Sequence, residues 1–282
     1  MEEAKKQYEL SSAETLFKKS FALFEAKFKT LLGIILISVV IQTPLLSKGM
    51  IPSDRPFLFL VVSLTTIFFS LWSSLALFYV IVGNKEGVGL KEAYRRSLRK
   101  IHSYFWISIL VGGYLLGGFT LFLIPVIIFL IWFNFCFFIL ISENLVGIDT
   151  LMKSRDYVKG IFLKILGRMS LAYFLCGLVW YFCFMVYGIF SNGNIDWGFP
   201  FSDQRSFSED LVSNLIYTIL SPILIGYSFF LYEDVKIAKE GMVFAPSRGR
   251  KNKYLIFAIL GFIYFLSVGS FIVVVSSFVP AS

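Results

Sequence analysis

Few side chains in this sequence have the types and spacing that catalysis or metal binding requires. The single histidine, His102, borders an uncharged stretch, where an amphipathic anchor is a more common role than a catalyst. The chain contains no HExxH, GxSxG or GxxxxGK(S/T) pattern, the signatures of a zinc protease, a serine hydrolase and a nucleotide phosphate loop. The three cysteines lie in apolar runs without metal-ligating neighbours, at Cys136, Cys176 and Cys183. The sequence therefore predicts no catalytic, cofactor-binding or metal-binding residue, and no enzyme activity.

Charged residues are missing from long stretches of the chain, which indicates a membrane protein. Of its 282 residues 57% are hydrophobic, against about 45–50% in soluble domains. A helix that crosses a bilayer needs about 20 mostly apolar residues. The longest uncharged run, 101–142, is long enough for two spans joined by a hairpin near Pro125. The uncharged runs predict an all-α polytopic bundle of seven spans, at 30–47, 56–84, 101–142 (two spans), 169–195, 211–232 and 254–282.

The basic residues are distributed unequally between the segments that connect these spans. Of the 26 Lys and Arg residues, 23 lie in residues 1–29, 85–100, 143–168 and 233–253. Short loops rich in Lys and Arg stay in the cytoplasm. The N-terminus is therefore predicted in the cytoplasm and the C-terminus outside. The formal net charge of +8 then reflects membrane topology, and no nucleic-acid partner is predicted.

Three charged segments on the predicted cytoplasmic side have the pattern of amphipathic helices. In residues 149–169 the apolar side chains recur on one helical stripe, and Asp149 is a plausible N-cap. Such a helix lies in the headgroup plane of a membrane. Residues 11–28 and 88–105 repeat the pattern. We therefore predict a single membrane domain, 1–282, that begins with three repeats of an interfacial helix and two spans. The repeats are 1–83, 84–142 and 143–232, and a basic loop and a final span follow at 233–282.

The basic residues of these segments have two compatible interpretations. They enforce topology, or they also bind anionic lipid headgroups, at about 1 kcal/mol for each residue near the surface. The candidate anionic-lipid contacts are Arg95, Arg96, Arg99, Lys153, Arg155 and Arg168.

Hydroxyl side chains recur at spacings of three and four along the second span, so they share one helix face. They form either a polar cavity wall or a close packing surface between helices, and packing is the more common use. The sixth span contains Pro222, which should free a backbone carbonyl near Thr218. A helix broken in this way can mark a binding site, although the break is more often a kink that helps neighbouring helices to pack. The candidate cavity or packing residues are Ser63, Thr66, Ser70, Ser73 and Pro222.

Two motifs resemble those of a known bacterial family. The sixth span exits as SPILIGYSFFLYEDVKIAKEG, and the fourth continues as IPVIIFLIWFNFCFFILISENLVGIDTLMKSRDYVKG. The first is similar to a Pro-then-Tyr-Asp-Leu-Arg-x-Arg-x-Glu-Gly ending, with Glu233 as an insertion, and it matches at Tyr232, Asp234, Lys236, Lys239, Glu240 and Gly241. The second is similar to a family segment in which a span that begins with Pro is followed by an acidic residue with Gly. A helix that contains a basic residue next to Ser comes after these.

Together these motifs resemble the membrane domain found beside glycerophosphodiester phosphodiesterase catalytic domains, and its stand-alone relatives of unknown function. The resemblance implies a bacterial cytoplasmic membrane. It does not extend to the enzyme, which needs paired histidines and carboxylates that bind a metal.

These observations favour a non-enzymatic module that organises anionic phospholipid or a membrane protein partner at the inner leaflet. The alternative is a small-molecule transporter or lipid translocator whose cavity lies between the second and sixth spans. No run of about 20 apolar residues is interrupted by Asp, Glu, Lys or Arg, and most proton- and ion-coupled transporters keep such a residue in the membrane. The module is therefore the preferred hypothesis.

Overall fold

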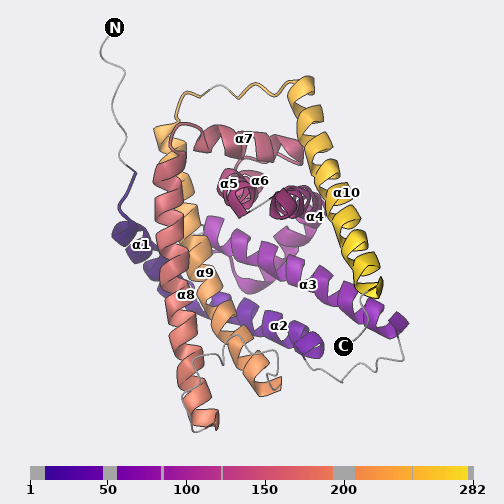
Figure 1. Cartoon of the computed structure of the whole chain (residues 1–282). Coiled ribbons are helices and arrows are strands. Elements are labelled where there is room, and N and C mark those ends of the chain that lie inside the picture. The colour runs from indigo at the N-terminus through magenta and orange to yellow at the C-terminus, as the bar shows by residue number, and fades with distance from the viewer. Residues whose placement is uncertain are drawn as a thin grey trace. The chain divides into compact units, whose positions relative to one another are not determined.

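The computed structural model describes residues 10–46, 56–83, 86–121, 123–192, 207–242 and 244–278. Within these ranges the chain forms α-helices and no strand (Figure 1), so the all-α class is confirmed. The helices are α1 (Ala13–Ala26), α2 (Phe28–Leu46), α3 (Pro56–Val82), α4 (Leu90–Leu121), α5 (Leu123–Phe133), α6 (Cys136–Ser142), α7 (Ile148–Val158), α8 (Phe162–Asn192), α9 (Phe207–Ala238) and α10 (Arg248–Phe278).

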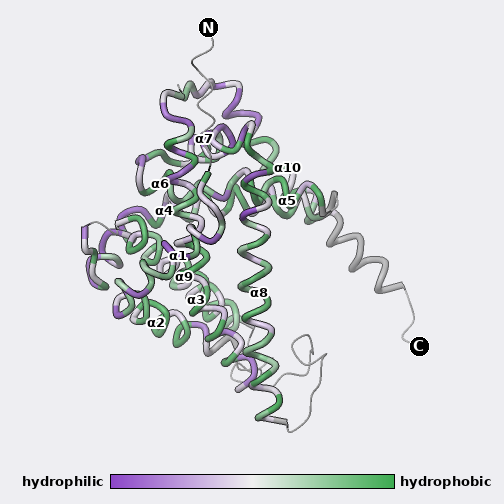
Figure 2. The backbone as a smooth tube through the Cα atoms, turned by 90° about the vertical axis from the view of Figure 1, so that its left-hand side faces the viewer, coloured by the Kyte–Doolittle hydropathy of each residue, from purple (hydrophilic) through white to green (hydrophobic). Residues whose placement is uncertain are grey.

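Five stretches of the described chain are long and apolar enough to cross a membrane: Phe57–Val82, Leu90–Phe119, Ile124–Ser142, Phe162–Ser191 and Phe207–Ala238. Each overlaps a predicted span, and the long uncharged run divides into two of them, as expected. The apolar part of α2, Phe28–Thr43, is shorter. Large apolar side chains stand exposed along these helices, for example Phe174, Phe182 and Phe190 of α8, which is hydrophobic over most of its length (Figure 2). Such a surface suits lipid rather than water.

The chain divides into two compact units. Unit 1 contains Met1–Ile101 and Gly167–Asp234, and unit 2 contains His102–Leu166 and Val235–Ser282. The helices α4, α8 and α9 each begin in one unit and end in the other.

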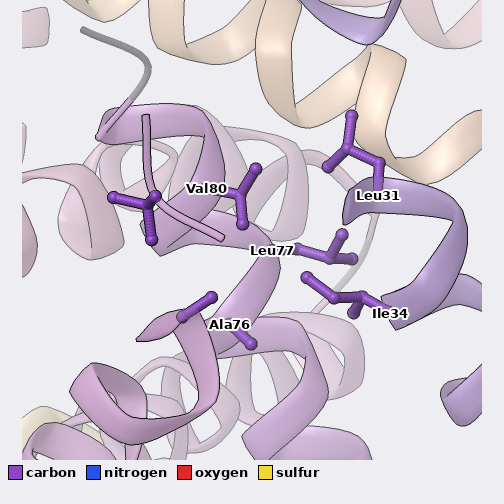
Figure 3. Close-up of a cluster of buried hydrophobic side chains, with 7 residues drawn as sticks. Leu31, Ile34, Ala76, Leu77 and Val80 are labelled. Atoms are coloured by element: carbon purple, nitrogen blue, oxygen red, sulfur yellow. The ribbon is translucent and has the colours of Figure 1, made fainter. Parts of the chain in front are cut away.

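Unit 1 has a core in which α2 packs against α3. Leu31 and Ile34 of α2 lie close to Leu77 and Val80 of α3 (Figure 3). Ala76, Val88 and Ala93 complete this buried cluster. Leu31 and Ile34 are one helical turn apart on α2, and Leu77 and Val80 are one turn apart on α3. Each helix therefore makes the contact with a single apolar stripe.

Unit 2 is organised around α7, which packs on α5, α6 and α10. The buried Ser154 hydroxyl lies where α5 ends and α6 begins: it donates to the Trp132 carbonyl at 2.6 Å and accepts from the Phe135 amide at 3.2 Å. These two backbone groups lie at the helix break, so α7 provides the partner that a continuous helix would have supplied.

In the same unit α4 and α10 approach closely at glycines. A Cβ atom built on Gly261 would lie 2.1 Å from the Gly113 carbonyl oxygen, and one on Gly117 would lie 2.6 Å from the Gly261 Cα. Only glycine permits this distance between backbones. Nearby, the Tyr114 hydroxyl donates to the Tyr254 carbonyl at 3.0 Å.

The amphipathic segments differ from the prediction in three respects. The predicted helix over 149–169 is broken, because Gly160 has a φ of +85° between the end of α7 and the start of α8. The N-cap of α7 is Gly147 and not Asp149, whose carboxylate instead pairs with Lys251 at 2.7 Å. The second segment, 88–105, is no separate helix, since α4 continues from Leu90 into the span.

Candidate functional site

The predicted lipid contacts fall in both units. Arg95, Arg96, Arg99 and Arg168 belong to unit 1, and Lys153 and Arg155 belong to unit 2.

Arg95 and Arg96 are engaged in ion pairs on the surface of α4. Arg95 contacts Glu92 at 2.5 Å, and Arg96 contacts Glu92 at 2.8 Å and Glu86 at 2.6 Å. The two carboxylates balance the two guanidinium charges locally. Arg99 is exposed further along α4. The charge that these residues offer to a headgroup is therefore smaller than the sequence indicated.

Arg168 holds the N-terminal segment of the described chain. Its Nε donates to the Ser11 carbonyl at 2.9 Å and its Nη2 to the Leu10 carbonyl at 2.8 Å. The Asp234 carboxylate accepts from the Ser11 amide at 3.0 Å, and the Tyr227 hydroxyl donates to the Arg168 carbonyl at 3.1 Å. These contacts give Arg168 a structural role within unit 1.

Lys153 is the centre of a half-buried charge network in unit 2. It pairs with Glu143, and the two side chains are only 18% and 10% exposed. The Tyr157 hydroxyl donates to the same carboxylate at 2.8 Å. Burial, and then the hydrogen bond to Glu143, raise the pKa of Tyr157 above its usual value. Lys153 is thus compensated within the protein, as the low exposure of its charge requires.

Arg155 differs from the other five because it lines a cavity. Its guanidinium carbon lies 4.4 Å from the centre of the Trp132 ring, and its Nη1 donates to the Tyr254 hydroxyl at 3.3 Å. Stacking on an aromatic ring orients the planar guanidinium and leaves its in-plane donors available. No carboxylate of the described residues forms an ion pair with it in this structure.

Two cavities meet at Arg155, and together they are called the Arg155 crevice below. They share Trp132, Arg155 and Arg250. The first, of about 430 Å³, is also lined by the charged side chains of Asp156 and Lys159. The second, of about 440 Å³, is mainly aromatic, and its further lining residues are Tyr114, Phe129, Phe133, Lys253, Tyr254 and Phe257.

The charge of the crevice is positive. Arg155, Lys159, Arg250 and Lys253 carry positive charge there, and Asp156 is the lining carboxylate. Arg250 Nη2 donates to both oxygens of Asp156 at 2.9 Å, a hydrogen-bonded pair that raises the pKa of Arg250. One of the four cations is therefore balanced, and an anionic group can interact with the remaining charge.

The crevice has a buried aromatic floor and an exposed basic rim. Tyr114, Phe133 and Tyr254 are buried, whereas Arg155 and Lys159 are exposed. The sequence indicated Arg155 as a candidate contact, and the basic stretch 246–253 allowed the same interpretation, whereas the aromatic lining residues, Asp156 and Lys159 were missed. The basic stretch that precedes the last span was a partial signal for Arg250 and Lys253.

The predicted hydroxyl stripe lies in unit 1. Thr66 and Ser73 are buried, and Ser63 and Ser70 are half-buried. The Ser73 hydroxyl is 3.0 Å from the Tyr94 hydroxyl, a hydrogen bond between α3 and α4. This contact is of the packing kind, and the two cavities described above are lined by other residues.

The helix α9 continues through Pro222, which is buried. The predicted free carbonyl of Thr218 accepts a hydrogen bond from the Ser221 hydroxyl at 2.9 Å. A neighbouring side chain thus replaces the amide that proline lacks.

Among the described residues no group of three or more His, Cys, Asp and Glu side chains is arranged to hold a metal ion. No protein-family model, curated protein or solved structure matches this chain. The resemblance to the membrane domain of the phosphodiesterases therefore rests on the motifs quoted above and stays a prediction.

Proposed function

We propose that this chain is a non-enzymatic membrane module with seven spans that binds anionic phospholipid at the cytoplasmic surface of a bacterial plasma membrane. The N-terminus lies in the cytoplasm and the C-terminus outside. The observation that carries the proposal is the Arg155 crevice, where unbalanced positive charge stands directly beside an aromatic lining. Anionic phospholipids combine the same two properties, a negative headgroup and an apolar chain.

The rigidity of α7 supports this proposal. Asp149 and Asp156 of α7 pair with Lys251 and Arg250 at the start of α10, at 2.7 and 2.9 Å. Ser154 joins the same helix to the break between α5 and α6. The basic side chains of α7 are thus presented from a helix held at three points, so little ordering entropy is lost when they bind a headgroup.

The proposal is tested by reconstituting the full chain in nanodiscs of phosphatidylcholine with an increasing share of phosphatidylglycerol. A ligand that binds only the folded state raises its stability. We expect the unfolding temperature to rise with the anionic share and the gain to shrink at high salt, since salt screens exposed charges. An unfolding temperature that does not depend on lipid charge would contradict the proposal.

A lipid translocator is the second candidate, and the break between α5 and α6 favours it. Discontinuous helices often lie at the substrate sites of transporters, and Trp132 beside this break also lines the crevice. The test is the flipping of a fluorescent anionic phospholipid in proteoliposomes, followed by quenching from one side. Flipping at the rate of protein-free liposomes would exclude this candidate and leave the binding module.

A further inference from the structure

We infer that the Arg155 crevice is a site for a single phospholipid, with the headgroup phosphate at Arg155, Lys159 and Arg250 and one acyl chain along the aromatic lining. This inference rests on the proposed function and deepens it. The proposed function requires only that anionic lipid binds at a basic surface, whereas the inference assigns one phospholipid molecule to the Arg155 crevice.

The arginines of the crevice suit a phosphate group. An arginine side chain has five N–H donors and no acceptor, and it suits the oxygens of a phosphate. Arg155 donates one side-chain hydrogen bond, to the Tyr254 hydroxyl, and its contact with the face of the Trp132 ring uses no donor. Arg250 contributes one nitrogen to Asp156. Both guanidinium groups therefore retain donors for phosphate oxygens.

The aromatic cavity suits an acyl chain. The aromatic cavity continues from the basic rim between side chains of α4, α5 and α10, through Tyr114, Phe129, Phe133 and Phe257. Phe257 is also 61% exposed, and Ile256 and Leu260 of the same helix are exposed as well. The cavity therefore opens onto an apolar surface of α10 of the kind that contacts lipid. A soluble anion would need only the basic residues of the rim.

The volumes of the two cavities suit an organic ligand. Each cavity, at about 430 and 440 Å³, lies within the roughly 300–1,000 Å³ of sites that hold small organic ligands. The pair leaves room for a headgroup in one cavity and part of a chain in the other. One lipid per protein chain is the expected stoichiometry.

The test is native mass spectrometry of the full chain in detergent, delipidated and then titrated with phosphatidylglycerol. We expect a first bound molecule that is clearly tighter than any later one. Arg155→Gln should weaken this first binding about tenfold, the ratio that corresponds to 1.4 kcal/mol. Arg248→Gln is the matched control, since it removes the same charge from the start of α10 at an exposed residue outside the crevice lining. It should leave the first affinity unchanged.

If Arg155→Gln does not fold, Lys159→Gln replaces it, because Lys159 is exposed and lies just beyond the last residue of α7. Equal losses in the crevice variant and in the control would overturn the inference, since they would indicate general attraction to charge. Glycerol 3-phosphate provides a second arm. Competition by this chain-free phosphate ester as strong as by lysophosphatidic acid would overturn the lipid assignment and identify a soluble phosphate site.

These outcomes separate the two proposals. Stabilisation by anionic nanodiscs with no distinct first lipid leaves the proposed function standing and removes the single-lipid site. The absence of both effects removes both.

Discussion

Replacing Ser154 by alanine should destabilise unit 2 more than any other change of a single hydroxyl on α7. The hydroxyl donates to the Trp132 carbonyl at 2.6 Å and accepts from the Phe135 amide at 3.2 Å, and Ser154 is fully buried. Each buried hydrogen bond contributes about 1 kcal/mol, and a buried polar group that loses its partner costs about 1–3 kcal/mol. We therefore expect Ser154→Ala to lower the free energy of unfolding by about 2–4 kcal/mol.

The assay is reversible denaturation of the purified chain in detergent, compared with Ser108→Ala as control. The Ser108 hydroxyl donates to the Tyr104 carbonyl one turn earlier in α4, a local bond at 2.9 Å within a continuous helix. Its removal should cost about 0.5 kcal/mol or less, since that helix keeps its own backbone bonds. Equal losses for the two variants would refute the argument that α7 completes the hydrogen bonding of the α5–α6 break.

Three further predictions concern other parts of the chain. Gly261→Ala should lower the free energy of unfolding by about 1–3 kcal/mol, because its Cβ would lie 2.1 Å from the Gly113 oxygen. Gly249→Ala is the control, since its Cβ would meet open space, and it should cost nothing. Thermal unfolding of the two variants measures the difference. Tyr157 has a raised pKa in the folded chain, so its contribution to stability is complete below the ordinary tyrosine pKa of about 10 and is lost as pH rises through the higher folded value. Tyr157→Phe should therefore flatten the fall in unfolding temperature above about pH 10. An unchanged slope would contradict this. Thr66→Cys, in a chain whose native cysteines are replaced by alanine, should resist a water-soluble maleimide in intact membranes because Thr66 is buried, and rapid labelling would instead indicate a wet cavity at the hydroxyl stripe.

The five long apolar helices were predictable because a charged side chain rarely lies at membrane depth, so the gaps between charges mark them. The division of residues 101–142 between two candidate spans followed from length alone. The breaks inside helices were less visible. Gly160 permits a φ of +85° and ends the predicted 149–169 helix, yet glycine is common within membrane helices and gave no clear signal. The break after Phe133 contains neither Gly nor Pro, and the serine that completes it comes from another helix.

The candidate site was predictable only in part, since burial and pairing decide which basic residues are available. Lys153 and Arg155 are two residues apart on α7, but Lys153 faces Glu143 and Arg155 faces Trp132. Arg250 and Tyr254, which complete the crevice beside Arg155, lie far along the sequence in α10. A periodic pattern indicates which face of a helix is polar, and it does not indicate which carboxylate a given cation meets.

The most direct test of the account is an electron cryomicroscopy map of the full chain in nanodiscs that contain phosphatidylglycerol. The account predicts density for one phosphate within hydrogen-bonding distance of Arg155 and Arg250, continuous with a chain that runs past Phe133 toward Phe257. A map in which lipid surrounds the spans but the Arg155 crevice holds only water, or is closed by side chains, would contradict it.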